Sequence, residues 1–272
     1  MEERSLTVVK SNKLISASYR LGLDEQRLLL ACISQIDSRL ELSKKDEFTV
    51  TAKQFASMFG SDPKSAYKQI EAAAEDLFER KIVVDNKKEK IKFVSRWSSS
   101  VEYNYGEGSV TIGFSQKILP LISQLKEQFT KYNLEHVSRL TSVHAIRIYE
   151  LCLQYLKIGE RNFEMSEFKK ILGLDGQYPE FKDFNKRVLK SSIDQINENT
   201  DIKIKVNPIR QNRKIVSLKF EIESKQARSH KVSKQKSEKE IRELANNLTI
   251  SDYIQTQKNE NQKLKKPSFK LH

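Results

Sequence analysis

The chain has 272 residues, with 49 Lys or Arg against 36 Asp or Glu, and its formal net charge is +13. Hydrophobic residues make up 38%, which is enough for a folded core and excludes a wholly disordered chain. The positive excess favours a polyanionic partner, nucleic acid first and an anionic membrane second; a basic protein without such a partner is the alternative. No segment approaches the roughly 18 continuous apolar residues of a membrane span. The N-terminus has no apolar signal core, so we expect a cytoplasmic protein without membrane contacts.

Two distant segments resemble each other. "RLLLACISQI" (27–36) and "RIYELCLQYL" (147–156) place Arg27 opposite Arg147, and Cys32 opposite Cys152. Because these are the only two cysteines and both sit on apolar helical patterns, we expect small buried side chains in a reducing compartment, without a disulfide. Two Cys and four scattered His show no zinc spacing, so we expect neither a metal nor another cofactor.

Three helices are predicted in the first half. The first follows Asp24, a candidate cap, and continues with apolar residues at helical spacing. Thr51 is predicted to cap a short second helix that Gly60 ends. The third begins at Asp62–Pro63, with proline at a favoured first helical position.

Strand patterns follow these helices. Residues 81–97 and 98–114 alternate between apolar and polar side chains, around predicted turns at Asp85–Asn86 and Gly106–Gly108.

The second half repeats this order. "FEMSEFKKILGLDG" matches "FTVTAKQFASMFGSD", so that Phe168 pairs with Phe55 and Gly173 with Gly60 at an offset of 113. A third helix over 179–200 and two strands joined at Gln211–Lys214 complete the repeat. Helix, helix, helix and hairpin, written twice, predict an α+β, helix-rich fold of two tandem winged-helix domains with β-hairpin wings. Two unrelated three-helix units are the alternative.

We divide the chain into three segments at two boundaries. Residues 1–135 form the N-terminal winged-helix domain, and residues 136–224 form the C-terminal one. Residues 225–272 form a basic tail, predicted to be disordered. This tail holds 12 Lys or Arg against 5 Asp or Glu and supplies +7 of the net charge.

The third helix of the second domain is the strongest candidate for reading DNA. Its apolar residues fall on one half of a helical wheel. The other half, the reader face, carries charged residues: Lys182, Asp183, Lys186, Arg187 and Lys190. In a major groove, Arg and Lys donate to guanine and Asp accepts from cytosine. A solvated helix face is the alternative.

The first domain has a different charge pattern on its third helix. Lys64, Ser65 and Lys68 open the exposed face, but Glu71, Glu75 and Glu79 follow. Because acidic residues repel phosphate, only the first turn should meet DNA. We therefore expect the second domain to read bases and the first to grip the backbone or contact proteins.

Basic hairpin tips are weaker candidates for DNA contacts. Lys87 and Lys88, with Asn86 and Lys90, lie at the predicted first wing, and Arg210, Arg213 and Lys214 lie at the second. Wings contact phosphate or the minor groove, but Lys-rich turns also protect strand edges.

Catalysis has little support in the sequence. A nicking enzyme needs closely spaced metal-binding histidines and a nucleophilic tyrosine, and His136, His144, His230 and His272 form no such cluster. No Gly-rich phosphate loop with Lys-Ser/Thr is present. We therefore expect no enzymatic activity. The competing interpretations are a winged-helix transcriptional regulator without an origin function, a nicking enzyme, and a structural basic adaptor.

Two blocks resemble a known family. "VVKSNKLISASYRLGLDEQRLLLACISQI" and "RVLKSSIDQINENTDIKIKV" are similar to the iteron-binding replication initiators of theta-replicating bacterial plasmids, the RepA/RepE type. The resemblance covers roughly residues 5–223. It implies two winged-helix domains without enzymatic activity. It also implies that the base-reading helix falls on residues 180–197, in agreement with the charged face.

The resemblance further implies the partners of the chain. Monomers would bind double-stranded DNA at repeated origin sites (iterons), and homodimers joined through the first domain would repress the initiator's own promoter at an operator. Host partners would be a DnaA-type initiator, the replicative helicase and chaperones that convert dimer to monomer.

Overall fold

The structure is a computed structural model that describes residues 6–86 and 90–226. The chain divides into two compact units, Met1–Ser224 and Lys225–His272, and the following sections concern the described residues of the first. The predicted disorder of the tail falls on residues 227–272, outside the described residues. Among the described helices, none combines the length and apolar character needed to cross a bilayer.

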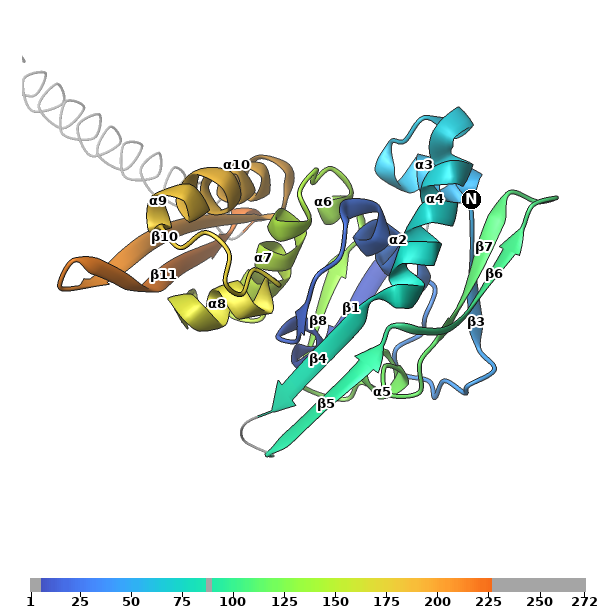
Figure 1. Cartoon of the computed structure of the whole chain (residues 1–272), viewed down its shortest axis with the longest axis horizontal. Coiled ribbons are helices and arrows are strands. Elements are labelled where there is room, and N and C mark those ends of the chain that lie inside the picture. Colours follow the sequence, from blue (N-terminus) through green and yellow to red (C-terminus); the bar gives the residue numbers. More distant parts are fainter. Residues whose placement is uncertain (1–5, 87–89, 227–272) are drawn as a thin grey trace, which may run out of the picture. The chain divides into compact units, whose positions relative to one another are not determined.

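The fold consists of short helices and antiparallel strands (Figure 1). The first elements are β1 (Thr7–Ser11), α1 (Asn12–Ile15), β2 (Ser18–Tyr19), α2 (Leu23–Ile33), β3 (Glu47–Thr51), α3 (Ala52–Phe59), α4 (Pro63–Glu79), β4 (Lys81–Asn86), β5 (Ile91–Arg96), β6 (Ser98–Asn104), β7 (Ser109–Phe114), α5 (Leu119–Ile122), β8 (Phe129–Asn133) and α6 (Glu135–Ser138). The remaining elements are α7 (Val143–Leu153), β9 (Glu160–Glu164), α8 (Met165–Ile171), α9 (Phe181–Phe184), the π-helical segment η1 (Asn185–Leu189), α10 (Lys190–Asn199), β10 (Ile202–Gln211) and β11 (Lys214–Ser224).

Local signals fix the ends of α3 and the start of α4, as predicted. The Thr51 hydroxyl accepts from the Gln54 amide at 3.1 Å, and the Gln54 side chain accepts from the Thr51 amide at 2.9 Å. This capping box satisfies two amides that the first helical turn leaves without partners. Gly60 ends α3 in the left-handed conformation, with φ of 67°. Asp62 caps α4, and its side chain accepts from the Lys64 amide at 3.2 Å.

The predicted cap of the first long helix is wrong. Gly22 is the N-cap of α2, and Asp24 lies inside the first turn. There the Asp24 carboxylate lies 3.5 Å from Arg27, one turn further along. A carboxylate in the first turn stabilises the positive end of the helix without capping it.

Two three-stranded sheets share one topology. One has the order β3-β7-β6 and the other β10-β11-β9. In each, the strand before the second helix of the module pairs with the last strand of a hairpin: Val50 pairs with Val110, and Phe163 with Leu218. The doubled order of helices and strands in the sequence is therefore a doubled fold.

Two further sheets complete the fold. The pairing of β1 with β8 was not predicted, nor was the addition of β2 to β4. The strands β4 and β5 within residues 81–97 were predicted and pair with each other. The predicted turn at Asp85–Asn86 is wrong, because both residues lie in β4 and pair with Lys92 and Ile91.

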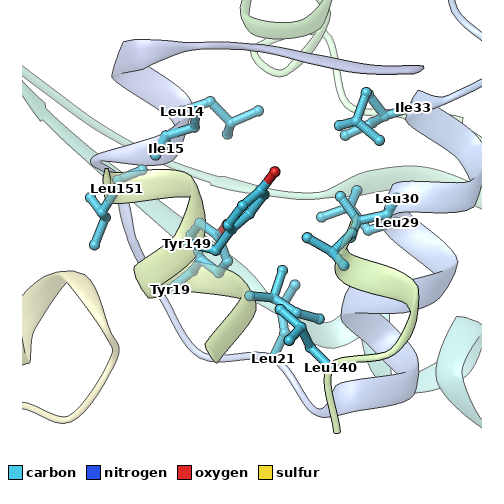
Figure 2. Packing of buried hydrophobic residues seen from close by; sticks show 14 of the residues in the cluster. Leu14, Ile15, Tyr19, Leu21, Leu29, Leu30, Ile33, Leu140, Tyr149 and Leu151 are labelled. Carbon is cyan, nitrogen blue, oxygen red and sulfur yellow. The ribbon is translucent and has the colours of Figure 1, made fainter. Parts of the chain in front are cut away.

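One hydrophobic cluster runs through both halves of the described chain. Figure 2 shows buried side chains of α1, α2 and α7 facing one another, among them Leu14, Leu29 and Tyr149. Cys32 and Cys152 are buried, free thiols in this cluster, as predicted. Helix α7 is thus a central packing element and is not confined to one module.

A buried ion pair lies at this centre. Lys10 of β1 is fully buried, and its ammonium group donates to the Glu150 carboxylate of α7 at 2.7 Å. The Tyr132 hydroxyl donates to the same oxygen at 2.5 Å, and Arg147 lies 3.6 Å from the other carboxylate oxygen. Burial lowers the pKa of Lys10 from its ordinary value, although Glu150 opposes this shift. The pair therefore ties the β1–β8 sheet to α7 at a fully buried site.

We expect Glu150→Gln to destabilise the fold by about 3–5 kcal/mol, because it leaves the buried Lys10 without an opposite charge. The double variant Lys10→Met, Glu150→Gln should recover part of this loss. Denaturant unfolding measures both. The matched control is Glu160→Gln, which breaks a pair with Lys219 of the same 2.7 Å length at the surface. Equal effects of the two Glu→Gln substitutions would contradict the prediction.

We also expect both thiols to be unreactive in the folded chain. Burial raises the pKa of Cys32 and of Cys152 to about 12, so the nucleophilic thiolate is scarce at neutral pH. An aromatic disulfide reagent at pH 8 should titrate both thiols in strong denaturant and neither in buffer. Rapid modification in buffer would show that one of these helices opens.

Candidate nucleic-acid interface

The predicted reader helix is interrupted, which corrects the expectation of one continuous α-helix. It runs as α9, η1 and α10, and the Lys190 amide donates to the Asn185 carbonyl, five residues earlier. One such π turn adds a residue to the helical turn and shifts the side chains that follow around the axis. The apolar face is nevertheless kept, because Phe184, Val188 and Ile196 are all buried.

The reader face is exposed as predicted. Lys182, Asp183, Lys186, Arg187 and Lys190 all lie on the exposed side of α9, η1 and the start of α10. Within the described residues, none of its four cations has an ion-pair partner. No carboxylate of residues 6–86 or 90–226 must therefore be displaced before these cations meet an anion.

Lys169, a half-buried residue of α8, positions the start of α9. Lys169 donates to the Tyr178 carbonyl at 2.6 Å and to the Gln177 carbonyl at 3.3 Å. Its ammonium group also lies 5.3 Å from the centre of the Phe184 ring. These contacts fix the loop that leads into α9, so the reader face begins at a defined place.

Helix α4 carries the first module's candidates. Lys64 and Lys68 are exposed and Ser65 is half-buried; its hydroxyl donates to the Asp62 carbonyl at 3.1 Å. Further along, Glu75 and Glu79 are exposed. Since only the first turns of α4 are positive, the structure keeps the asymmetry that the sequence predicts between the two modules.

The second wing is the β10–β11 hairpin. Arg210, Arg213 and Lys214 are exposed at its tip, where the register shifts between Ile209 and Arg210. Such a bulge increases the local twist and redirects side chains at the end of a ribbon. No partner of these three cations is found in the described part of the chain.

The first wing differs from the sequence interpretation. Sheet order makes β6–β7 the equivalent of β10–β11, because both hairpins pair with the strand that precedes the second helix. The β4–β5 hairpin is an additional element that belongs to another sheet with β2. The candidates Lys87 and Lys88 lie outside the described residues.

Tyrosines gather at the β6–β7 hairpin, and the sequence analysis missed them. Tyr105 at the turn is 73% exposed, and its ring centre lies 6.5 Å from that of Tyr103 and 6.4 Å from that of Tyr67 on α4. The alternation in "YNYGEG" was the available signal. Of these three rings, only that of Tyr105 is exposed. Burial raises the pKa of the Tyr103 hydroxyl, and the nearby carboxylates of Glu75 and Glu71 on α4 raise it further. An exposed ring suits contact with a sugar or a base face.

The described residues contain no group of three His, Cys, Asp or Glu side chains arranged to hold a metal ion. The repeated helices and hairpins, with one strongly cationic helix face, define the class of the protein as a tandem winged-helix protein.

Sequence comparisons identify the family. Residues 7–153 match the family described as "Initiator Replication protein, WH1", and residues 164–222 match "Initiator Rep protein, WH2". The chain is 32% identical to a "Replication initiation protein" of Escherichia coli over 225 residues, covering 80% of this chain and 70% of that relative. This chain belongs to the initiator replication protein family.

Two further similarities support this assignment. The chain is 26% identical to the "PI protein" of Escherichia coli, covering 77% of this chain and 80% of that protein. Its fold matches the crystal structure of the Pi initiator protein in complex with iteron DNA with a TM-score of 0.70. That match has 23% identity and covers 81% of this chain and 98% of the other. It confirms the tandem winged-helix fold.

Proposed function

We propose that this protein initiates plasmid replication by binding repeated sites in double-stranded origin DNA, with the second module as the main reader of bases. The observation that carries the proposal is the exposed cationic face of α9, η1 and α10, whose lysines and arginine have no ion-pair partner in the described part of this family member. The Pi initiator, whose fold is similar, is solved with iteron DNA, and this supports the same class of ligand. A winged-helix transcriptional regulator without an origin function is the second candidate.

The proposal assigns base contacts and phosphate contacts to different parts of the chain. The reader face supplies base contacts, since arginine and lysine donate to guanine acceptors in the major groove. The first turns of α4 and the wing tips supply phosphate contacts, which hold the protein in register but carry no sequence information. Two readers one helical turn apart cover about 20 base pairs.

Further features of the proposal come from the family resemblance. We propose that the monomer binds origin repeats and that a homodimer, joined through the first domain, represses the protein's own promoter. We also propose domain boundaries at 135/136 and 224/225, a cytoplasmic location, no catalytic activity, and host partners of the DnaA, helicase and chaperone types.

The proposal is tested by fluorescence anisotropy at two salt concentrations. One probe carries a single repeat from the DNA that flanks the gene, and the other is a scrambled copy. A preference of about a thousandfold that survives moderate salt is expected for a specific reader. Equal binding that collapses with salt would mean that charge alone holds the DNA. Tandem repeats beside an AT-rich segment would favour the initiator over the regulator.

We expect Arg187→Ala and Lys190→Ala to weaken binding to the repeat by about tenfold or more, because each removes a base contact worth about 1–3 kcal/mol. Lys68→Ala should weaken both probes equally and lower the logarithmic salt slope by about 0.9. The control is Lys45→Ala, at an exposed lysine in the loop before β3. An equal or reversed ranking of the two modules would contradict the assigned roles.

We expect a chain that ends at Ser224 to bind random DNA more weakly and with a flatter salt dependence. The removed residues carry +7 of the net charge, and each phosphate they neutralise adds about 0.9 to the salt slope. Discrimination between repeat and scrambled probe should be retained. Unchanged binding to random DNA would refute a role for the tail.

A further inference from the structure

The Arg147 side chain connects the two family-matched spans. It projects from α7, is 2% exposed, and donates to the Ala17 carbonyl at 2.8 Å and to the Tyr19 hydroxyl. Its guanidinium group lies 3.8 Å from the centre of the Tyr19 ring. The same group donates across to the Ile171 carbonyl of α8 at 3.2 Å. One buried cation is therefore held by the first span and contacts the second.

The end of α8 receives these contacts. The last carbonyls of a helix have no partners within the helix and carry partial negative charge. Here the Ile171 carbonyl accepts from Arg147, and the Lys170 carbonyl accepts from the Ser18 hydroxyl at 2.6 Å. Gly173 follows with φ of +69°, and a Cβ at this position would lie 2.6 Å from the Tyr19 carbonyl oxygen. Side chains of the first family-matched span thus donate to the last carbonyl groups of α8 in the second span, and the two backbones approach each other closely at Gly173.

A second attachment, counted by the family-matched spans 7–153 and 164–222, joins α7 and Thr141 to α10 and the residues after it. The Tyr149 hydroxyl of α7 donates to the Asp201 carboxylate at 2.8 Å, and the Thr141 amide donates to the Gln195 side chain at 2.9 Å. The Lys170 ammonium group also lies 3.5 Å from the Asp85 carboxylate of the first span. Several attachments restrict rotation as well as separation, and a cavity of about 320 Å³ borders the one that Arg147 makes.

Arg27, the repeat equivalent of Arg147, provides an internal comparison. It donates to the Leu140 carbonyl at 3.3 Å and lies 5.5 Å from the centre of the Phe59 ring. All of these residues lie within the first family-matched span, 7–153, although Leu140 lies beyond the proposed 135/136 boundary. The same residue type at the same repeat position therefore makes contacts within one family-matched span in α2 and joins the two spans in α7.

We propose that Arg147 is a positioning residue that fixes the orientation of the second winged-helix module and thereby sets the spacing between the DNA half-sites that one chain accepts. This inference rests on the proposed function for its DNA consequence. Its structural part, the fixed orientation, can be tested without DNA.

The first experiment measures orientation directly by single-molecule fluorescence energy transfer. Dyes are attached at Lys45→Cys in the first module and Lys203→Cys in the second, both at exposed positions. We expect one narrow transfer distribution for the parent chain and for the control Arg27→Met, and a broad or shifted distribution for Arg147→Met. Identical distributions for all three chains would overturn the proposal.

The second experiment measures spacing in DNA. One repeat, with its two half-sites located by footprinting, is compared with copies carrying one or two inserted base pairs, each of which turns the second site by about 35°. We expect the parent chain and Arg27→Met to lose about 100-fold in affinity on insertion, and Arg147→Met to lose less than about tenfold. An undiminished spacing penalty in Arg147→Met would overturn the proposal.

Two safeguards keep the test decisive. If Arg147→Met does not fold, the double variant Ser18→Ala, Gly173→Ala is used in its place, because both positions lie at the contact between the first module and the end of α8. In a separate comparison, Arg147→Lys should restore part of the spacing penalty that Arg147→Met loses. If the parent chain shows no specific DNA binding, the proposed function fails. The energy-transfer experiment then still decides whether Arg147 fixes the module orientation.

Discussion

The buried charges on α7 constrain the arrangement of the fold. Glu150 accepts from Lys10 and Tyr132, and Arg147, one turn away, donates to carbonyls of both modules. Charges removed from water are tolerated only when their partners are held in place. The pairing of β1 with β8, the position of α7 and the position of α8 are therefore constrained together, because each holds a partner of one of these charges. Helix α7 is shared by both modules for this reason, although its sequence repeats α2.

The sequence predicts whatever is encoded locally. The Thr51 cap, the end of α3 at Gly60 and the strands β10 and β11 each lie within a short window, and all were predicted. The β1–β8 sheet was not, because Lys10 pairs with Thr130 across 120 positions and lysine in "TVVKS" reads as exposed. The π turn was missed for a related reason, since the same apolar residues fit a regular helix and an interrupted one.

The candidate interface was also predicted only where it depends on local sequence. The five charged residues of the reader face could be assigned from helical spacing, because that face depends only on which side of one helix is apolar. The first wing could not, because the first module has two successive hairpins and only sheet order shows that β6–β7 takes the wing position. Tyr105 and its neighbours were missed along with it.

Duplication gave this chain two similar scaffolds whose surfaces then differ. Helix α4 carries acidic residues where α9, η1 and α10 carry cations without an ion-pair partner among the described residues, so the two helix faces differ in charge. A weak module still adds to binding when it is tethered, because its contacts form at high effective concentration. That gain is retained as specificity only if the link is stiff, since a flexible link accepts many spacings. A buried arginine that contacts both family-matched spans supplies such stiffness beside the cavity.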